Sequence, residues 1–175
     1  VRSPEDERAH RKEMCAIGYQ IFATHRWGYL GDGHISARDP ILTDHFWLLD
    51  WGVPFGAATP DRLVLVGPGG EVFDAAGNPT GAVNTAGYNI HAPLLAARPD
   101  VVSACHTHTA FGTPWSANVE PFRALSQEST AFVFDQALFD DEEVEVLSVE
   151  GGKRIAAALG DAKFCILRNH GPLTV

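Results

Sequence analysis

Residues 101–108 read VVSACHTH, an apolar run that leads directly into two histidines two positions apart. Such a short apolar run is typical of a buried β-strand. On a strand, residues i and i+2 point to the same side, so the imidazoles of His106 and His108 can reach one metal ion. The ends of strands are also where α/β sheets place their ligands. The segment therefore predicts a central strand and one part of a metal site.

A second segment repeats this pattern near the other end of the chain. The apolar run Phe164–Leu167 leads into Arg168-Asn169-His170-Gly171. Neutral imidazole suits zinc, manganese, iron or cobalt, and three histidines leave positions open for water or substrate, as in catalytic sites. A lone His-x-His pair is more often an ordinary hydrogen-bonding pair, but the agreement of both segments favours a ligand set. We expect one divalent metal ion per chain on His106, His108 and His170, with zinc as the first expectation and iron, manganese or cobalt as alternatives.

The rest of the chain indicates an α/β domain with one mixed sheet covered by helices. Apolar residues recur at helical spacing up to about Thr24, among them Met14, Ile17 and Ile21. The turn Pro68-Gly69-Gly70 predicts a hairpin. Helices are predicted at residues 3–24, 85–97 and 152–159, and strands at 34–37, 46–49, 63–66, 71–73, 101–108, 132–134, 144–147, 164–167 and 173–175. His91 lies inside the second helix pattern, where packing is the first interpretation, whereas His34 beside a glycine turn fits either packing or a site.

Composition excludes several classes of function. The chain has 175 residues, 45% of them hydrophobic, which suits one domain over 1–175, and its formal charge of −9 argues against a nucleic-acid partner. No apolar run approaches the roughly 20 residues of a membrane span, and the charged start lacks the apolar core of a signal peptide. The three cysteines are odd in number and widely spaced, which predicts reduced thiols in a cytoplasmic protein. The missing initiator Met and the final run 172–175, which reads like mid-strand, suggest a domain truncated at its C-terminal end.

Four short motifs make a family resemblance specific. They are Gly33-His34-Ile35-Ser36, Ala97-Arg98-Pro99-Asp100, His106-Thr107-His108-Thr109 and Arg168-Asn169-His170-Gly171. With them the chain resembles the class II aldolase/adducin family over nearly its whole length. The resemblance implies a three-layer α/β/α fold around a mixed, largely antiparallel sheet, and a cytoplasmic homotetramer. It also implies a metal, often zinc, on His106, His108 and His170, which in the sugar-phosphate aldolases polarises the substrate carbonyl and stabilises an enediolate.

This sequence departs from the sugar-phosphate aldolases at functional positions. Their catalytic glutamate lies 19 residues before the first metal histidine, which is Gly87 here. Where their phosphate loops carry asparagine and a Thr/Ser-rich turn, this chain has His34 and Leu49-Asp50-Trp51-Gly52. Aspartate repels phosphate and tryptophan offers a single donor, so a sugar phosphate is not the expected substrate. We expect a small-molecule substrate contacted by His34, Ser36, Asp50 and Asn169.

The missing glutamate leaves open which group handles the proton. Glu128, in Ser126-Gln127-Glu128-Ser129, is the first candidate for a catalytic carboxylate, although a solvated loop acid is the commoner reading of such a residue. Water at the ion, or a residue from outside this chain, are the other sources.

Three functions are weighed against one another. The first is a metal-dependent lyase that cleaves a carbon–carbon bond next to a carbonyl, as an aldolase or a decarboxylase. The second is a non-haem iron oxygenase on the same three histidines, oxidatively decarboxylating an aromatic 2-oxo or 2-hydroxy acid. The third is a non-catalytic scaffold, as in the adducins, which resemble the family in fold but have lost metal ligands. Because all three histidines are present, the lyase is favoured and the scaffold is the weakest of the three.

Overall fold

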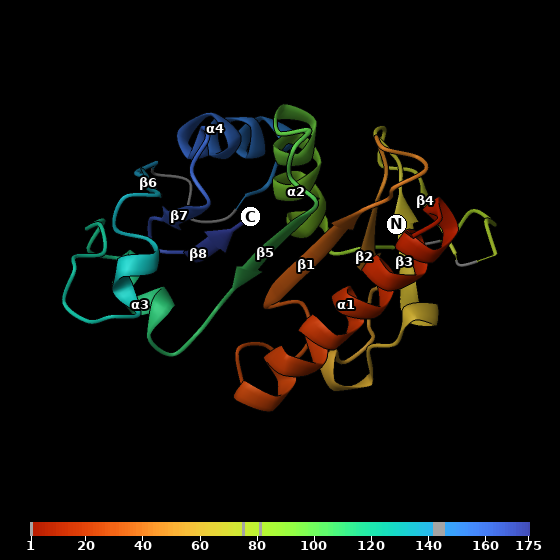
Figure 1. The fold of residues 1–175 in the computed structure, drawn as a ribbon, viewed down its shortest axis with the longest axis horizontal. Helices are drawn as coiled ribbons and strands as arrows, with labels where there is room; N and C mark the ends of the chain where they lie inside the picture. The colour runs from red at the N-terminus through yellow and green to blue at the C-terminus, as the bar shows by residue number, and fades with distance from the viewer. Residues whose placement is uncertain (1, 75, 81, 142–145) are drawn as a thin grey trace.

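The computed structural model describes residues 2–74, 76–80, 82–141 and 146–175, which form an eight-stranded sheet with helices on both faces (Figure 1). The strands are β1 Gly33–Arg38, β2 Phe46–Leu49, β3 Leu63–Val66, β4 Val72–Phe73, β5 Ser103–Thr107, β6 Gln136–Phe139, β7 Phe164–Leu167 and β8 Gly171–Thr174. Their order across the sheet is β4-β3-β2-β1-β5-β8-β7-β6. The pairing of β6 with β7 is parallel and the other pairings are antiparallel. The predicted mixed, largely antiparallel sheet is therefore confirmed.

The helices divide between the two faces of this sheet. They are α1 Pro4–His25, α2 Thr85–Ala97, α3 Gly112–Ser116 and α4 Val149–Leu159, with short 3-10 turns η1 Phe55–Ala57, η2 Pro60–Arg62 and η3 Ser129–Ala131. Alternate residues of β2 belong to different cores: Leu48 packs with α2 and α4, whereas Trp47 packs with α1. The two helices α2 and α4 lie side by side over one face (Figure 1), closely enough that a Cβ at Gly152 would overlap the backbone carbonyl of Asn89. These layers confirm the expected α/β/α fold.

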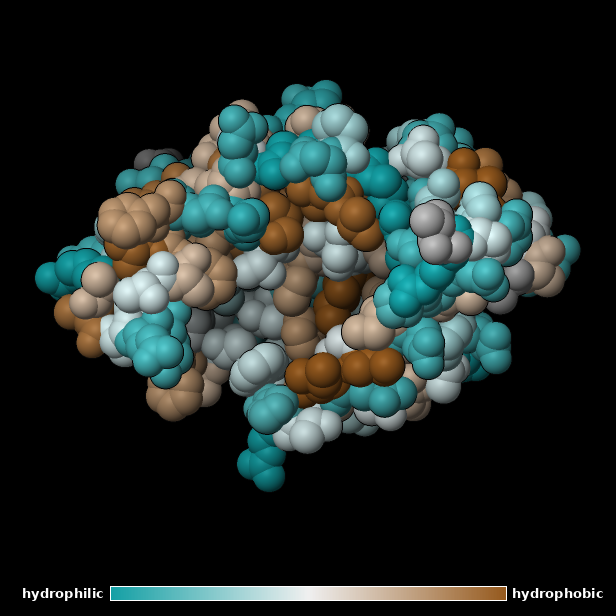
Figure 2. Space-filling model, in the orientation of Figure 1, coloured by the Kyte–Doolittle hydropathy of each residue, from teal (hydrophilic) through white to brown (hydrophobic). Residues whose placement is uncertain are grey.

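Helix α1 begins where the sequence predicts but buries a different face. Ser3 caps it by accepting a hydrogen bond from the Asp6 N–H, and Pro4 occupies the first turn, where its missing N–H costs nothing. The buried residues are Cys15, Ala16, Tyr19 and Phe22. Met14, Ile17 and Ile21, whose spacing predicted the helix, are 38–51% exposed. Figure 2 shows exposed apolar side chains in the region that α1 covers in Figure 1.

Two predicted elements differ from the structure. The strand expected at 132–134 is wrong, because these residues form a turn after η3 and the strand β6 begins only at Gln136. The aromatic residues that suggested it do not pair along a sheet: Phe132 packs on Phe164, and Phe134 is 98% exposed. Of the strand expected at 144–147, only residues 146 and 147 are among those described, and they carry no strand.

Helix α4 also starts earlier than the sequence indicated. It begins at Val149 rather than at 152, because Ser148 caps it by accepting a hydrogen bond from the Gly151 N–H. Among all helices in the described ranges, none combines the length and the apolar character needed to cross a bilayer.

Candidate functional site

Three histidines converge at one end of the central strands. His106 lies on β5, His108 follows the last residue of that strand, and His170 lies in the turn between β7 and β8. Because β8 pairs with β5, the turn before β8 is brought to the end of β5. One nitrogen from each ring lies within 4.8 Å of the others, and the ring centroids are 4.5–5.0 Å apart. The three predicted ligand residues therefore form one cluster.

The hydrogen bonding of His106 turns a free lone pair toward this cluster. Its Nδ1 lies 2.9 Å from the carbonyl oxygen of Pro172, which can only accept, so Nδ1 carries the proton. Its Nε2 is buried and has no hydrogen-bond partner among the described residues. A buried nitrogen without a partner is costly unless something else coordinates it. A backbone carbonyl that fixes the outer nitrogen is also the usual partner of a metal-bound imidazole. The residues present thus fit a divalent metal ion.

The surroundings keep these imidazoles neutral, which is the form that binds a metal. Burial lowers the pKa of His170 to about 4 and lowers that of His106 well below its ordinary value. Burial also lowers the pKa of His108, the least buried of the three, and Asp32 partly opposes this effect. At neutral pH all three rings offer lone pairs.

The turn that carries His170 is fixed by two unusual backbone conformations. Asn169 has φ +54°, in the left-handed region that asparagine tolerates better than most residues. Gly171 has φ +141°, and a Cβ there would lie 2.6 Å from the carbonyl oxygen of Thr107. No other residue type allows β8 to begin this close to the end of β5. The Asn-His-Gly sequence is therefore what positions His170.

A pocket of about 310 Å³ opens beside the cluster. Its lining consists of Gly31, Gly33, His34, Ala86, His108, Thr113, Asn169 and His170. The hydroxyl of Thr113 is buried at this pocket and has no hydrogen-bond partner among the described residues. Sequence reasoning missed Thr113, because α3, the helix that carries it, is short and has no periodic pattern. A buried hydroxyl without a partner is uncommon in folded proteins, which makes Thr113 a candidate ligand-binding residue of this pocket.

The predicted substrate residues fall at different depths. His34 and Asn169 line the pocket itself, and Asp50 lines a small neighbouring hollow that also includes His34. Ser36 is fully buried and reaches the site only through the ring of His91. Glu128 lies on an exposed loop at the start of η3, and it is not among the residues that line the pocket. A hydrogen bond from its own backbone N–H and one from Ser126 lower the pKa of Glu128.

A buried hydrogen-bonded chain lies directly behind the pocket. Nδ1 of His34 is 2.6 Å from Nε2 of His91, and Nδ1 of His91 is hydrogen-bonded to the hydroxyl of Ser36. The sequence assigned His91 to helix packing, but the structure gives it two specific polar partners. Gly87 on the same helix faces this chain, since a Cβ there would lie 3.2 Å from Cγ of His34.

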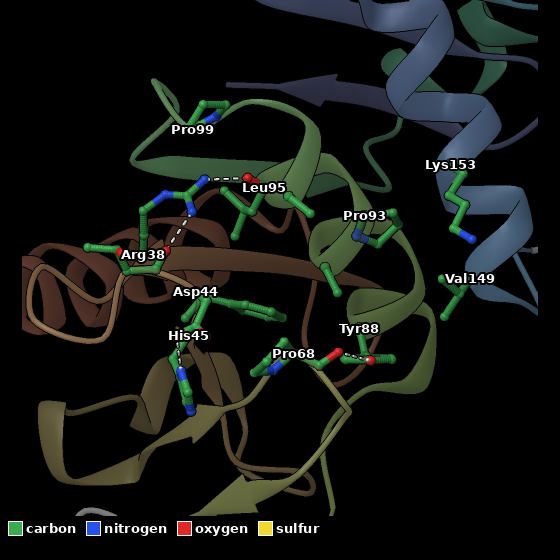
Figure 3. A pocket seen from close by; sticks show the side chains of 14 residues that line it. Arg38, Asp44, His45, Pro68, Tyr88, Pro93, Leu95, Pro99, Val149 and Lys153 are labelled. Carbon is green, nitrogen blue, oxygen red and sulfur yellow. Dashed lines mark hydrogen bonds and ion pairs between the residues drawn. The ribbon is translucent and has the colours of Figure 1, made fainter.

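A larger pocket, of about 470 Å³, lies away from the histidine cluster between α2, α4 and the start of β2 (Figure 3). Its charged side chains already have partners. Arg38 donates to the carbonyl oxygens of Leu95 and Val101, and Lys153 pairs with Glu150. With its cations engaged in this way, this pocket lacks the converging free groups of the histidine site.

The sequence and the fold match known proteins along almost the whole chain. Residues 12–175 match the Class II Aldolase and Adducin N-terminal domain. The chain is 36% identical over 174 residues to the 4-hydroxy-3-prenylphenylpyruvate oxygenase/4-hydroxy-3-prenylbenzoate synthase of Streptomyces roseochromogenus subsp. oscitans, covering 97% of this chain and 61% of that protein. It is equally similar to the decarboxylase NovR of Streptomyces niveus, with 36% identity over 174 residues, 97% of this chain and 62% of that protein. The chain thus spans about three fifths of these relatives.

The fold agrees with that of a solved enzyme. The structure described as L-fuculose 1-phosphate aldolase from Glaciozyma antarctica PI12 matches 100% of this chain and 67% of its own, with a TM-score of 0.87 and 37% sequence identity.

Proposed function

Because the chain belongs to the class II aldolase and adducin family, we propose that it is a metal-dependent lyase that cleaves a carbon–carbon bond next to a carbonyl group. The observation that carries the proposal is the unpartnered, buried Nε2 of His106, which lies among two further imidazoles at the wall of a pocket. His106, His108 and His170 would hold one divalent ion per chain, with zinc as the first expectation and iron, manganese or cobalt as alternatives. When bound, the ion supplies Lewis-acid polarisation of a substrate oxygen.

The chain's own residues would bind and orient the substrate around that oxygen. The carbonyl of Pro172 holds the ring of His106 in place. His34, Asn169 and Thr113 line the pocket, and their polar side chains would contact the substrate. Glu128 remains our proposed proton-handling carboxylate, and its loop would have to approach the pocket for this role. Replacing it by glutamine tests the role, since a general acid/base contributes about 10²–10⁴-fold to the rate.

For the substrate we propose a small carbonyl or carboxylate compound rather than a sugar phosphate. Asp50 and Trp51 stand in the turn beside His34, and Gly87 leaves no carboxylate in the first turn of α2. The two Streptomyces relatives carry the names of an oxygenase of a phenylpyruvate and of a decarboxylase, which supports an acid substrate. The solved L-fuculose 1-phosphate aldolase supports the opposite choice, so a sugar phosphate must be one arm of the test.

The oxygenase named among the relatives makes oxidative decarboxylation the second candidate function. The same three histidines would then hold iron, and the reaction would consume molecular oxygen. A non-catalytic adducin-like scaffold is the third candidate, which the complete histidine cluster disfavours.

A single panel of assays separates these functions. The chain is purified without metal, loaded with zinc, manganese or iron(II), and incubated with 4-hydroxyphenylpyruvate, pyruvate plus an aldehyde, or L-fuculose 1-phosphate, with and without oxygen. Oxygen-independent cleavage or condensation of the acids supports the proposal. Oxygen uptake with iron alone supports the oxygenase, and turnover confined to the sugar phosphate overturns the proposed substrate class. Absence of turnover with every metal and substrate, together with no metal binding, favours the scaffold.

The family also leads us to propose a homo-oligomer, with a tetramer as the first expectation. The exposed Met14, Ile17 and Ile21 of α1 offer apolar surface that a second copy would bury. Light scattering coupled to gel filtration measures the mass directly, and a monomer at micromolar concentration contradicts this part of the proposal.

A further inference from the structure

A chain of three buried side chains joins the core of the protein to the histidine site. Ser36 and His91 are completely buried and His34 is 3% exposed. His34 and Ser36 lie two positions apart on β1 and therefore on one face, which α2 covers with His91. The two hydrogen bonds run from Ser36 through His91 to Nδ1 of His34.

The direction of these hydrogen bonds follows from counting protons. The hydroxyl of Ser36 has His91 as its hydrogen-bond partner, and the described residues offer its proton no second acceptor. If the hydroxyl donates to Nδ1 of His91, then a neutral His91 carries its proton on Nε2 and donates to Nδ1 of His34. The reverse direction would leave the buried hydroxyl proton without an acceptor, which is unfavourable. The first direction gives Ser36, both nitrogens of His91 and Nδ1 of His34 a partner, and leaves the N–H on Nε2 of His34 for a ligand.

From this geometry we infer that Ser36 and His91 are positioning residues, which hold His34 in the tautomer with its proton on Nε2. His34 then presents an N–H donor to an acceptor oxygen of a ligand bound beside the three-histidine cluster. The fixed tautomer follows from the hydrogen bonds alone, whereas the ligand that the donor binds rests on the proposed function.

The environment of His34 agrees with this assignment. Both rings are buried, and their hydrogen bonds in the chain go to each other and to a hydroxyl rather than to a carboxylate, which favours the neutral form of each ring. Nε2 of His34 has no hydrogen-bond partner among the described residues, and His34 lines the same pocket as His108, Asn169 and His170. Gly87 provides the space for the ring, since its missing side chain would meet Cγ of His34.

The chemistry of the donor defines the ligand class. A neutral N–H binds an acceptor such as a carboxylate, a carbonyl or an enolate oxygen, and does not favour another donor. Its position beside the cluster suits a 2-oxo acid, whose two adjacent oxygen-bearing groups can be shared between the ion site and His34. In this role His34 selects for an anionic oxygen next to the reacting carbonyl.

Nitrogen-15 NMR of the zinc-loaded chain, labelled at histidine, tests the tautomer directly. The expected His34 spectrum shows a protonated Nε2 and an unprotonated Nδ1, and the His34→Gln variant identifies its signals. In Ser36→Ala this preference should weaken or reverse, because His91 loses its donor. Ser103→Ala is the matched control, since that hydroxyl donates to the backbone carbonyl of Ser36 and not to the chain of rings. A proton on Nδ1 of His34 in the wild type overturns the inference even if Ser36→Ala does not fold, and so does an unchanged tautomer in Ser36→Ala.

The donor role has its own measurement. The affinity of the zinc-loaded chain for pyruvate is compared between the wild type and His34→Phe, which keeps an aromatic ring but offers no donor. We expect binding to weaken about tenfold, which corresponds to one lost hydrogen bond to a charged group. Equal affinity of the two proteins for pyruvate would overturn the donor role of His34. The NMR result decides the tautomer independently of this measurement. Neither measurement uses lyase activity, so a failure of the inference can be told apart from a failure of the proposed function.

Discussion

Gly87 on α2 and His34 on β1 share one space, because an ideal Cβ at Gly87 would lie 3.2 Å from Cγ of His34 and 3.4 Å from its Cβ. A separation of 3.2 Å is tighter than nine in ten real Cβ contacts. A side chain at residue 87 would therefore push the imidazole from its place beside the site, and glycine leaves it there. Position 87 is where the family resemblance places a catalytic glutamate in the sugar-phosphate aldolases. In this chain the imidazole of His34 fills the space next to that position instead.

This relationship predicts that Gly87→Ala lowers turnover but leaves the stability of the fold nearly unchanged. Alanine is favoured over glycine in a helix by about 1 kcal/mol, which offsets the close contact, so the free energy of unfolding should change by less than about 1 kcal/mol. The ring of His34 must shift by a few tenths of an ångström and strain its bond to His91. We expect turnover to fall about tenfold, a barrier change of about 1.4 kcal/mol. Urea unfolding and turnover are measured on the same samples.

The control for this variant is Gly56→Ala, where the new Cβ would meet only the Cβ of Ala23 at an ordinary 3.6 Å. Gly56→Ala should leave turnover unchanged. Gly87→Glu should not restore an aldolase, because its longer side chain displaces His34 altogether. Full activity in either Gly87 variant would show that the position of His34 does not matter.

Metal binding is expected to depend on His106 more than on any other histidine. His106→Ala removes the buried nitrogen that has no protein partner, so calorimetry with zinc should show one site per chain in the wild type and none of comparable affinity in the variant. The fold should persist, as circular dichroism can show, because the lost ring made one hydrogen bond to Pro172. The matched control is His25→Ala, an exposed histidine at the end of α1. If His106→Ala still bound one zinc ion per chain with the affinity of the wild type, His106 would not be a metal ligand.

The cluster of three histidines was predictable because it depends on local patterns. The spacing of His106 and His108 after an apolar run, and of His170 after another, is written in consecutive residues. That β5 and β8 are neighbours in the sheet is a non-local fact, which the sequence did not predict. Elements marked by strong periodicity and caps were predicted for the same local reason, although Ser148 started α4 earlier than expected.

The features that the sequence did not predict depend on contacts between residues far apart in the chain. The bonds from His91 to His34 and Ser36 span 57 and 55 positions and exist only because α2 lies across β1. Phe132 and Phe134 look like a strand in sequence, but one ring packs on Phe164 and the other is exposed. The local sequence shows which residues are apolar, but only the tertiary structure determines which residues they contact.

Thr113 is predicted to contribute to ligand binding and not to stability. Its buried hydroxyl has no partner within the described ranges, so Thr113→Val removes a desolvated polar group and keeps the shape. We expect the free energy of unfolding to stay equal or rise slightly, while kcat/KM falls about fivefold, close to 1 kcal/mol. Thr24→Val, at an exposed position near the end of α1, is the control. If Thr113→Val kept full kcat/KM, the hydroxyl would have no part in recognition.

The last prediction concerns Asp39, which follows β1 and fixes that strand to α1. Its fully buried carboxylate accepts hydrogen bonds from the guanidinium of Arg8 at 2.7 and 2.8 Å and from the indole of Trp47 at 2.8 Å. The backbone N–H groups of Ile41 and Leu42 donate to it as well, at 2.9 and 2.8 Å. Burial by itself raises the pKa of Asp39, but these hydrogen bonds together outweigh it and lower the pKa below its ordinary value.

A lowered folded-state pKa means that unfolded Asp39 binds a proton more readily than folded Asp39. The carboxylate therefore stabilises the fold fully at pH values above its unfolded pKa of about 3.9, and this contribution is lost as the pH falls through the folded value. Asp39→Asn should lower the free energy of unfolding by about 3 kcal/mol at pH 7, because Arg8 loses its buried counter-charge. Below about pH 4 the difference from the wild type should shrink. Urea unfolding of wild type and Asp39→Asn from pH 7 to pH 3 measures this pH dependence, with the exposed Glu13→Gln as control. A difference in unfolding free energy that stayed constant over the whole range would show that the ion pair does not stabilise the strand that carries His34.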